Sequence, residues 1–471
     1  MNNNSSSKEK QLVKNTVLYS ISNFGSKILT FLIVPLYTYY LSTSEYGTYD
    51  TMVSVMHLIA PLCILAVNEA LLRWLLKSEY DNETIVGTGF SLYFGFCGIT
   101  LLVMLIVFQF WAWQYKWNFV LILLSSTLQI VMQYTARGEK KNKAFAVSGV
   151  LYTIVMLGLN VILVIFLHQG IEGMLTSMTI AYLSSSLYLI IIMRNTYSLR
   201  KVKFNKKLAK EMLVYSSMLV PNNISWWVMN TSDRIMLTMM LGSSFTGIYS
   251  IACKFPTVVN VIHTLFYQAW QEQAVLEYDS ETRDEYYTKI FNSYMKLAGC
   301  LVLLLIPFSK LVIVYLMDES YIIAYKYIGI LYIGSLFSSF SGFYGTGYIS
   351  AKDTKNAMNT TMIGALVNIA INIILMKSIG IWAACISTLF GYMVVWLIRV
   401  KQTKKYFTIK VNWKVLALLI ALSTFASVMI CYDSNILTMA LLAIFSCVGI
   451  AVNKELLINL YKGIKRKVCN K

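Results

Sequence analysis

The feature that most constrains this chain is a series of long stretches without Asp, Glu, Lys or Arg. A bilayer core is about 30 Å thick, and a helix that crosses it needs roughly 20 mostly apolar residues. Stretches of that length recur along the sequence, for example at 84–115, 144–171 and 378–398. Together with an interrupted apolar segment at about 290–316, they predict an all-α polytopic membrane protein with about 14 transmembrane helices.

Composition agrees with this class and limits the partners. Of the 471 residues, 57% are hydrophobic and 13% are charged, against roughly 25% charged in ordinary soluble domains. The net charge of +18 would suggest nucleic-acid binding in a soluble protein. Because so apolar a chain leaves little soluble surface for a basic face, we expect membrane lipids and no nucleic acid as partners.

The distribution of basic residues predicts the orientation. Fourteen helices place both termini on one side of the membrane, and 32 of the 40 Lys and Arg residues then lie on that side. Three lysines lie in loops on the opposite side, and five basic residues lie within helices. Since cytoplasmic loops are enriched in Lys and Arg, we predict a multi-pass protein of the cytoplasmic membrane with both termini in the cytoplasm.

Two sequence echoes predict an internal repeat. At an offset of 200, the loop expected at 41–49 matches 241–249; at an offset of 210, the segment 170–182 matches 380–392. The paired residues are Leu41/Leu241, Ser44/Ser244, Gly47/Gly247, Tyr49/Tyr249, Gly170/Gly380, Ile171/Ile381, Ser177/Ser387 and Tyr182/Tyr392. We therefore predict an N-terminal six-helix lobe at 1–205, a C-terminal six-helix lobe at 206–405, and two further helices with a basic tail at 406–471. Repeated halves of this kind are typical of transporters.

Each predicted repeat begins with a helix that carries a polar stripe. The first stripe comprises Asn15, Tyr19, Asn23, Lys27 and Thr30, and the second comprises Asn223, Trp227, Asn230 and Arg234. Residues at these spacings share one helix face. The helix expected at 212–232 also contains Pro221, which predicts a kink beside a water-filled cavity. Hydrogen bonding between helices is the alternative interpretation of both stripes.

Charged residues within membrane helices usually face a cavity. Lys27, Arg234 and Lys254 are therefore candidates for binding an anionic substrate, together with Asn23, Asn223, Asn230 and Trp227. Lys310 lies near the expected outer end of its helix, where a lysine is expected to extend its amine to the interface.

Three residues are candidates for energy coupling or ion pairing. Glu69 and Arg73 are four residues apart, in the order that favours an ion pair, and Asp233 precedes Arg234. No nucleotide-binding, metal-binding or catalytic motif is recognisable, so we expect no cofactor, no metal and no catalytic residue. Transport energy would then come from a gradient of protons or sodium ions, the membrane potential or substrate supply.

Four segments together resemble a known family. They are KNTVLYSISNFGSK at 14–27, VPLYTYYLSTSEYG at 34–47, NTSDRIM at 230–236 and GIYSIACK at 247–254. The chain is similar to Wzx-type polysaccharide flippases, which are polysaccharide transporters of the multidrug/oligosaccharidyl-lipid/polysaccharide (MOP) exporter superfamily. The resemblance extends over essentially the whole chain.

This resemblance implies a bacterial flippase that moves undecaprenyl-pyrophosphate-linked glycan repeat units across the cytoplasmic membrane by alternating access. The product would be capsule, O-antigen or exopolysaccharide, with a polysaccharide polymerase and a chain-length regulator as partners. A flippase for the peptidoglycan lipid precursor is the closest alternative. A drug/cation antiporter and an integral-membrane glycan polymerase or ligase are weaker alternatives, because the stripes are cationic and no large outer loop is present.

Overall fold

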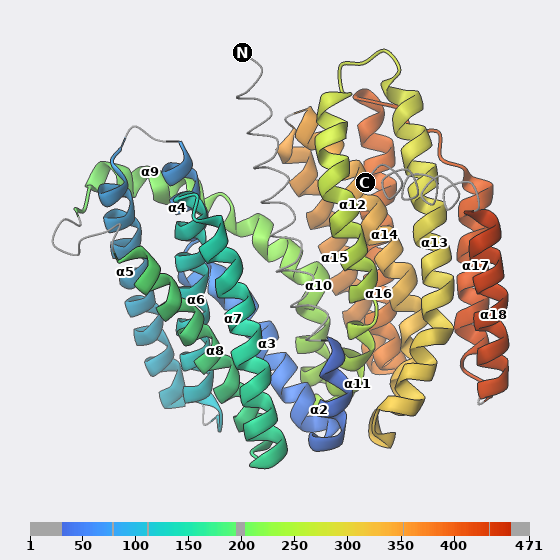
Figure 1. The fold of residues 1–471 in the computed structure, drawn as a ribbon, viewed down its shortest axis with the longest axis horizontal. Coiled ribbons are helices and arrows are strands. Elements are labelled where there is room, and N and C mark those ends of the chain that lie inside the picture. Colours follow the sequence, from blue (N-terminus) through green and yellow to red (C-terminus); the bar gives the residue numbers. More distant parts are fainter. Residues whose placement is uncertain are drawn as a thin grey trace, which may run out of the picture. The chain divides into compact units, whose positions relative to one another are not determined.

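The computed structural model describes residues 31–77, 80–110, 113–194, 203–351, 353–432 and 434–453 (Figure 1), and within these ranges the chain is helical and contains no strand. It divides into two compact units, Met1–Trp227 and Val228–Lys471. The first unit therefore extends past the predicted lobe boundary at 205, through one further helix and into the next.

The first unit is a bundle built around α4, α6 and α8. Its apolar core is formed by α3, α4, α5, α6 and α8, with α7 packed against α8, and α9 packed against α4 and α5. The elements are α2 (Val34–Tyr40), α3 (Thr43–Cys63), α4 (Val67–Leu76), α5 (Asn82–Phe110), α6 (Lys116–Gly138), α7 (Asn142–Asn160), the π-helix η1 (Val161–Phe166), α8 (Gly170–Met193) and α9 (Lys206–Ser217).

The second unit is a bundle around α14 and α16. Helix α16 packs against α14 and α15, and α14 also contacts α12, α13 and α17. The elements are α10 (Val220–Met240), which begins in the first unit, then α11 (Ser243–Lys254), α12 (Thr257–Leu276), α13 (Arg283–Leu316), η2 (Glu319–Ala324), α14 (Tyr325–Ser350), α15 (Thr354–Ile379), α16 (Ile381–Gln402), η3 (Thr403–Lys405), α17 (Trp413–Met429) and α18 (Asn435–Val452).

The helices have the length and polarity of membrane spans. Within the described residues, nine are long and apolar enough to cross a bilayer, and two bent helix pairs raise the number to eleven. In the most apolar stretch of α5 and of α18, 17% of the residues are buried inside the protein, whereas the share is 72% in the segment 319–348. Helix α14 is therefore central in its unit, and α5 and α18 present apolar surface outward. The prediction of an all-α polytopic membrane protein is confirmed.

The number 14 stays a prediction for identifiable reasons. The first expected span begins outside the described residues. Helix α10 is not among the nine spans, and it carries the predicted polar stripe. Helix α17 has 17 residues, slightly fewer than an isolated span needs.

The two expected loops at 41–49 and 241–249 are mostly helical. Helix α3 begins at Thr43, where Ser42 and Glu45 form a capping box, and α11 begins at Ser243 after Gly242, whose φ is +106°. A reciprocal capping pair supplies hydrogen-bond partners for the first turn, which is why the polar sequence starts a helix. In both units this helix is followed by a bend, of 55° between α3 and α4 and of 42° between α11 and α12.

The second echo also has a structural counterpart. Gly170 and Gly380 both have positive φ angles, +53° and +62°, and each stands at the start of a long helix, α8 or α16. Left-handed backbone at these points favours glycine, which explains why glycine occupies both positions.

Pro221 does not kink a continuous helix. Helix α9 ends at Ser217 and α10 begins at Val220, so the proline lies in the first turn of α10. The missing proline N–H costs no hydrogen bond there, because the first amides of a helix have no intrahelical acceptor.

The terminal helices α17 and α18 pack against the second unit through close contacts. A Cβ atom on Gly299 of α13 would lie 2.6 Å from Leu419, and one on Gly329 of α14 would lie 2.0 Å from the Ser427 hydroxyl oxygen. The linker before α17 is held as well, because Asn292 donates to the Lys410 carbonyl at 2.9 Å. Small residues thus allow the close helix packing on which association in lipid depends.

Lys310 differs from its predicted position. Its side chain is fully buried in α13, donates to the Tyr432 carbonyl at 2.6 Å, and lies 4.9 Å from the centre of the Tyr325 ring. The expected extension to the interface is wrong, because the turn between α17 and α18 covers this position and supplies an acceptor. Lys310 therefore fixes the terminal helix pair to α13.

We predict that Lys310→Ala loosens this attachment. The substitution removes a hydrogen bond to the Tyr432 carbonyl, which still accepts from the Ser434 N–H at 2.9 Å, and should destabilise the fold by about 1 kcal/mol. Thermal unfolding of the purified protein in detergent measures the effect. Lys289→Ala, at an exposed position on the same helix, is the control and should leave the unfolding temperature unchanged; equal temperatures for both variants would contradict the role assigned to Lys310.

Candidate functional site

A buried carboxylate lies at the centre of the second unit. Asp233 on α10 is 1% exposed. One carboxylate oxygen accepts hydrogen bonds from the hydroxyls of Tyr249 at 2.8 Å and Thr388 at 2.7 Å. The other accepts from the Asn372 amide at 2.6 Å and the Ser387 hydroxyl at 3.4 Å. Donors from α11, α15 and α16 therefore converge on one acid, and all are neutral.

A second layer of polar groups orients these donors. Asn368 lies one turn before Asn372 on α15 and accepts a hydrogen bond from its amide at 3.4 Å. Asn368 also accepts from Ser232 at 3.3 Å and donates to Ser387 at 3.2 Å. Residues four apart share a helix face, so α15 presents both amides toward α10 and α16. The network ties three helices together beneath the surface of a pocket.

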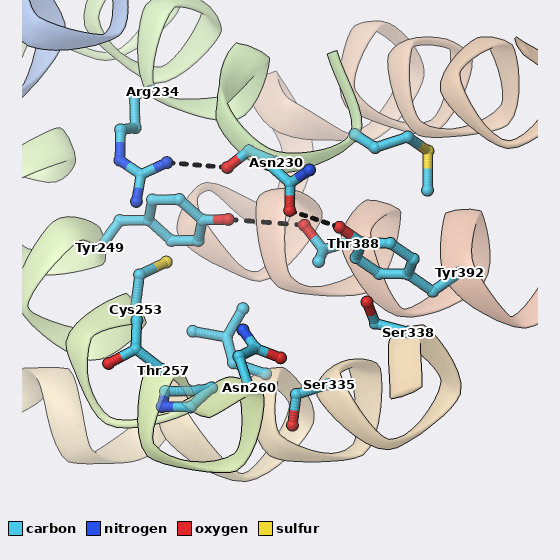
Figure 2. A pocket seen from close by; sticks show the side chains of 13 residues that line it. Asn230, Arg234, Tyr249, Cys253, Thr257, Asn260, Ser335, Ser338, Thr388 and Tyr392 are labelled. Carbon is cyan, nitrogen blue, oxygen red and sulfur yellow. Dashed lines mark hydrogen bonds between the residues drawn. The ribbon is translucent and has the colours of Figure 1, made fainter. Parts of the chain in front are cut away.

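The pocket opens beside Asp233, and Figure 2 shows the side chains around it. It has a volume of about 160 Å³ and lies entirely within the second unit. Its lining residues are Met229, Asn230, Arg234, Tyr249, Cys253, Pro256, Thr257, Asn260, Leu331, Ser335, Ser338, Thr388 and Tyr392. Tyr249 and Thr388 thus line the pocket and also donate hydrogen bonds to Asp233.

Arg234 supplies the positive charge of the wall. Its guanidinium donates to the Asn230 carbonyl at 3.0 Å and lies 5.9 Å from the centre of the Tyr249 ring. The Asn230 side chain accepts from the Tyr392 hydroxyl at 2.6 Å (Figure 2). Among the lining residues Arg234 is the basic one, and Asp233 lies behind the lining side chains of Tyr249 and Thr388. Most of the other polar lining groups are neutral amides and hydroxyls.

Three of the sequence candidates meet at this site. Asn230 and Arg234 line the pocket, and Asp233 lies directly behind it. Lys254 is the last residue of α11, next to the lining residue Cys253. Two of the four residues of the predicted stripe on α10, Asn230 and Arg234, therefore line one pocket.

The other members of that stripe belong to the first unit. The Trp227 indole donates to the Ser54 carbonyl of α3 at 2.8 Å, and Asn223 is half-buried one turn earlier. Asn23 and Lys27 lie outside the described residues.

Glu69 and Arg73 have different partners. Glu69 accepts a hydrogen bond from the Tyr134 hydroxyl at 3.1 Å, and Arg73 lies 4.3 Å from the centre of the Tyr215 ring. Tyr134 lies on α6 and Tyr215 on α9, and the Arg73 guanidinium also lies 5.5 Å from the centre of the Trp74 ring on α4 itself.

The sequence candidates do not include Asn368, Asn372, Thr388 and Tyr392. A signal for the first two exists, because they are two amide side chains one turn apart in the apolar part of the uncharged stretch 356–376. Polar residues in such a stretch usually face the bundle interior. In the described part of the chain, no group of three or more His, Cys, Asp or Glu residues is placed to hold a metal.

Comparisons with known proteins give the family and the fold. The sequence profile of the polysaccharide biosynthesis protein family matches residues 12–271. An uncharacterized membrane protein of Methanocaldococcus jannaschii is 26% identical over 310 residues, which are 61% of this chain. The match spans 60% of that relative's length.

Two solved structures resemble the fold. The lipid II flippase MurJ in an inward closed conformation has a TM-score of 0.68 at 15% identity, covering 94% of this chain and 100% of that chain. An inward-facing multidrug resistance MATE family transporter of the MOP superfamily has a TM-score of 0.65 at 14% identity, covering 83% and 95%. At these identities, the likeness establishes a MurJ- and MATE-like fold.

We predict that Asn372→Ala weakens the helix contacts around Asp233. The carboxylate loses a buried donor, which should cost about 1–3 kcal/mol of folding stability. A double-mutant cycle with Asp233→Asn, followed by thermal unfolding in detergent, should reveal a coupling energy between the two side chains. Ser378→Ala, at an exposed position on the same helix, is the control; strictly additive effects would refute the proposed interaction.

Proposed function

The chain belongs to the polysaccharide biosynthesis protein family, and from that premise we propose that it is a lipid-linked oligosaccharide flippase. Its substrate is an undecaprenyl-pyrophosphate-linked glycan repeat unit, destined for capsule, O-antigen or exopolysaccharide. The observation that carries this proposal is the polar pocket of Arg234, Asn230 and Tyr392, enclosed by membrane helices. Polar groups within membrane helices are costly, and binding of a polar headgroup during transport would explain why they are present.

We propose that transport proceeds by alternating access. The oligosaccharide headgroup passes through the protein while the lipid tail stays in the bilayer, beside α17 and α18. Lys27, Arg234 and Lys254 contribute positive charge for the pyrophosphate or for an acidic sugar. The protein acts as a transporter and not as an enzyme, in the cytoplasmic membrane of a bacterium with both termini in the cytoplasm. A polysaccharide polymerase and a chain-length regulator are its proposed partners.

We further propose that Asp233 couples transport to an ion gradient. A buried carboxylate is far cheaper when a proton or sodium ion neutralises it. The Asn372 carbonyl oxygen is buried and has no hydrogen-bond partner, so an additional oxygen ligand lies on a residue that already contacts the acid. Binding and release of a cation here would alter the contacts among α10, α11, α15 and α16.

Alanine at Lys27, Arg234 and Lys254 together should abolish surface polysaccharide in a strain that depends on this protein. Loss of charge-assisted contacts worth about 1.5–3 kcal/mol each weakens headgroup binding more than tenfold. Surface polysaccharide and accumulated lipid-linked intermediate are measured at equal protein level. Alanine at Lys116, Lys326 and Lys377, three lysines predicted to lie in outer loops, is the matched control. Normal polysaccharide in the first variant would overturn the assigned substrate site.

The same strain separates the alternatives. If depletion of the protein stops cell-wall synthesis and growth, the peptidoglycan precursor is the substrate. If depletion changes drug resistance alone, the protein is an antiporter. If lipid-linked repeat units reach the outer leaflet but remain unpolymerised, it is a polymerase or ligase.

Asp233→Asn should uncouple flipping from its gradient. The neutral amide keeps the shape of the side chain but removes the negative charge that attracts a cation. In proteoliposomes carrying labelled lipid-linked oligosaccharide, imposed proton and sodium gradients should accelerate the wild-type protein and leave this variant unaffected. Glu285→Gln, at an exposed acid in the first turn of α13, is the control. A gradient response equal to that of the wild type would exclude Asp233 as the coupling residue.

A further inference from the structure

The size of the pocket restricts its occupant. Its volume is about 160 Å³, and a cavity of about 150 Å³ in another protein accommodates one benzene molecule. The pocket therefore has room for a single six-membered ring and not for an oligosaccharide.

Three hydroxyl groups of the wall donate their protons to the protein. Tyr249 and Thr388 donate their protons to Asp233, and Tyr392 donates to the Asn230 side chain. A hydroxyl has one proton and two lone pairs. A hydroxyl that donates its proton to a protein acceptor can only accept hydrogen bonds from a ligand, through its oxygen lone pairs.

Two further hydroxyls follow the same pattern. Ser335 donates to the Tyr332 carbonyl at 2.7 Å, and Thr257 donates to the Lys254 carbonyl. Five hydroxyls that line the pocket therefore act as acceptors toward its interior. Figure 2 shows Ser335 and Asn260 across the pocket from Asn230 and Arg234, so polar groups face the ligand from both sides.

Such a wall selects for ligands that donate hydrogen bonds. Sugar hydroxyls are donors, whereas the oxygens of an ionised pyrophosphate diester only accept. Charge points the same way, because Asp233 lies behind two of the wall hydroxyls and Arg234 is the one Lys or Arg among the lining residues. Two phosphate charges would exceed what one cation compensates, and Arg234 itself disfavours a cationic drug.

We infer that this pocket binds one sugar residue of the lipid-linked glycan, and that the pyrophosphate lies outside it. This inference rests on the proposed flippase function and assigns one part of the substrate to one site. The sugar hydroxyls donate to Tyr249, Thr388, Tyr392 and Ser335. The Arg234 guanidinium and the Asn260 amide supply donors for an acceptor on the ring, such as an acetamido carbonyl or a carboxylate.

Ligand-dependent thermal stability of the full chain in detergent tests this inference. The probes are glucose, galactose, N-acetylglucosamine and glucuronate, each up to about 100 mM, and inorganic pyrophosphate. A ligand that binds the folded state alone raises stability in proportion to ln(1 + [L]/Kd). We expect at least one sugar to give a saturable increase, and pyrophosphate to give none that depends on the pocket. Protection by no sugar would overturn the inference.

Two substitutions that fill the pocket localise the binding. Asn260→Leu and Ser335→Leu should each raise the apparent Kd for the sugar at least about tenfold. The exposed Asn260 position tolerates a larger side chain, so it keeps the test valid if the buried Ser335 variant does not fold. Thr264→Ala, at an exposed position one turn further along α12, is the control. Sugar protection that survives Asn260→Leu would overturn the inference, as would pyrophosphate protection that this variant abolishes.

Surface polysaccharide distinguishes failure of this inference from failure of the proposed function. If the Lys27, Arg234 and Lys254 triple variant loses polysaccharide while Asn260→Leu retains normal export, the flippase function stands and the sugar pocket is rejected. If both variants export normally, both are rejected. Loss of export in both, with binding lost in Asn260→Leu, supports both.

Discussion

The hydrogen bonds to the Asp233 carboxylate organise much of the second unit. A carboxylate buried among membrane helices needs donors, and here they come from Tyr249, Asn372 and Thr388 on three different helices. Satisfying the acid therefore fixes how α11, α15 and α16 meet α10. It also fixes which way the tyrosine and threonine protons point, and so the hydrogen-bonding character of the neighbouring pocket. One buried charge thus determines both packing and recognition.

Two buried cations in the described part of this unit donate hydrogen bonds to neutral oxygen atoms. Lys310 donates to a carbonyl, and Arg399, which is 4% exposed, donates to the Ser341 carbonyl at 2.8 Å and to the hydroxyls of Thr360 and Thr361 at 3.1 Å each. In a low-dielectric interior, several well-placed dipoles can replace a counter-ion. Lys310 and Arg399 thus hold helices of this unit together through hydrogen bonds to neutral groups.

Sequence patterns predicted those parts of the fold that depend on neighbouring residues. Uncharged stretches located most helices, and helical spacing brought Asn230 and Arg234 to one face. The partners of Asp233 were not predictable in the same way, because Asn372 and Thr388 are more than 130 residues away along the chain and no local pattern specifies that contact. Capping and helix breaks were also misjudged: the Ser42 capping box starts a helix where a loop was expected. Lys310 was misplaced because only the tertiary fold brings the α17–α18 turn over it.

The repeat shows how a binding site can arise within one copy of a shared framework. The offset that pairs Leu41 with Leu241 and Tyr49 with Tyr249 places Ile33 opposite Asp233. In the first unit the Tyr49 hydroxyl lies 3.6 Å from the Met178 sulfur, and Tyr182 stacks on Tyr152. The counterparts Tyr249 and Tyr392 instead bind Asp233 and Asn230. The tyrosines are common to both copies, so they serve helix packing first. In the second copy the acid on α10, with Thr388 where the offset of 210 places Met178 in the first copy, makes the same tyrosines part of an oriented polar wall.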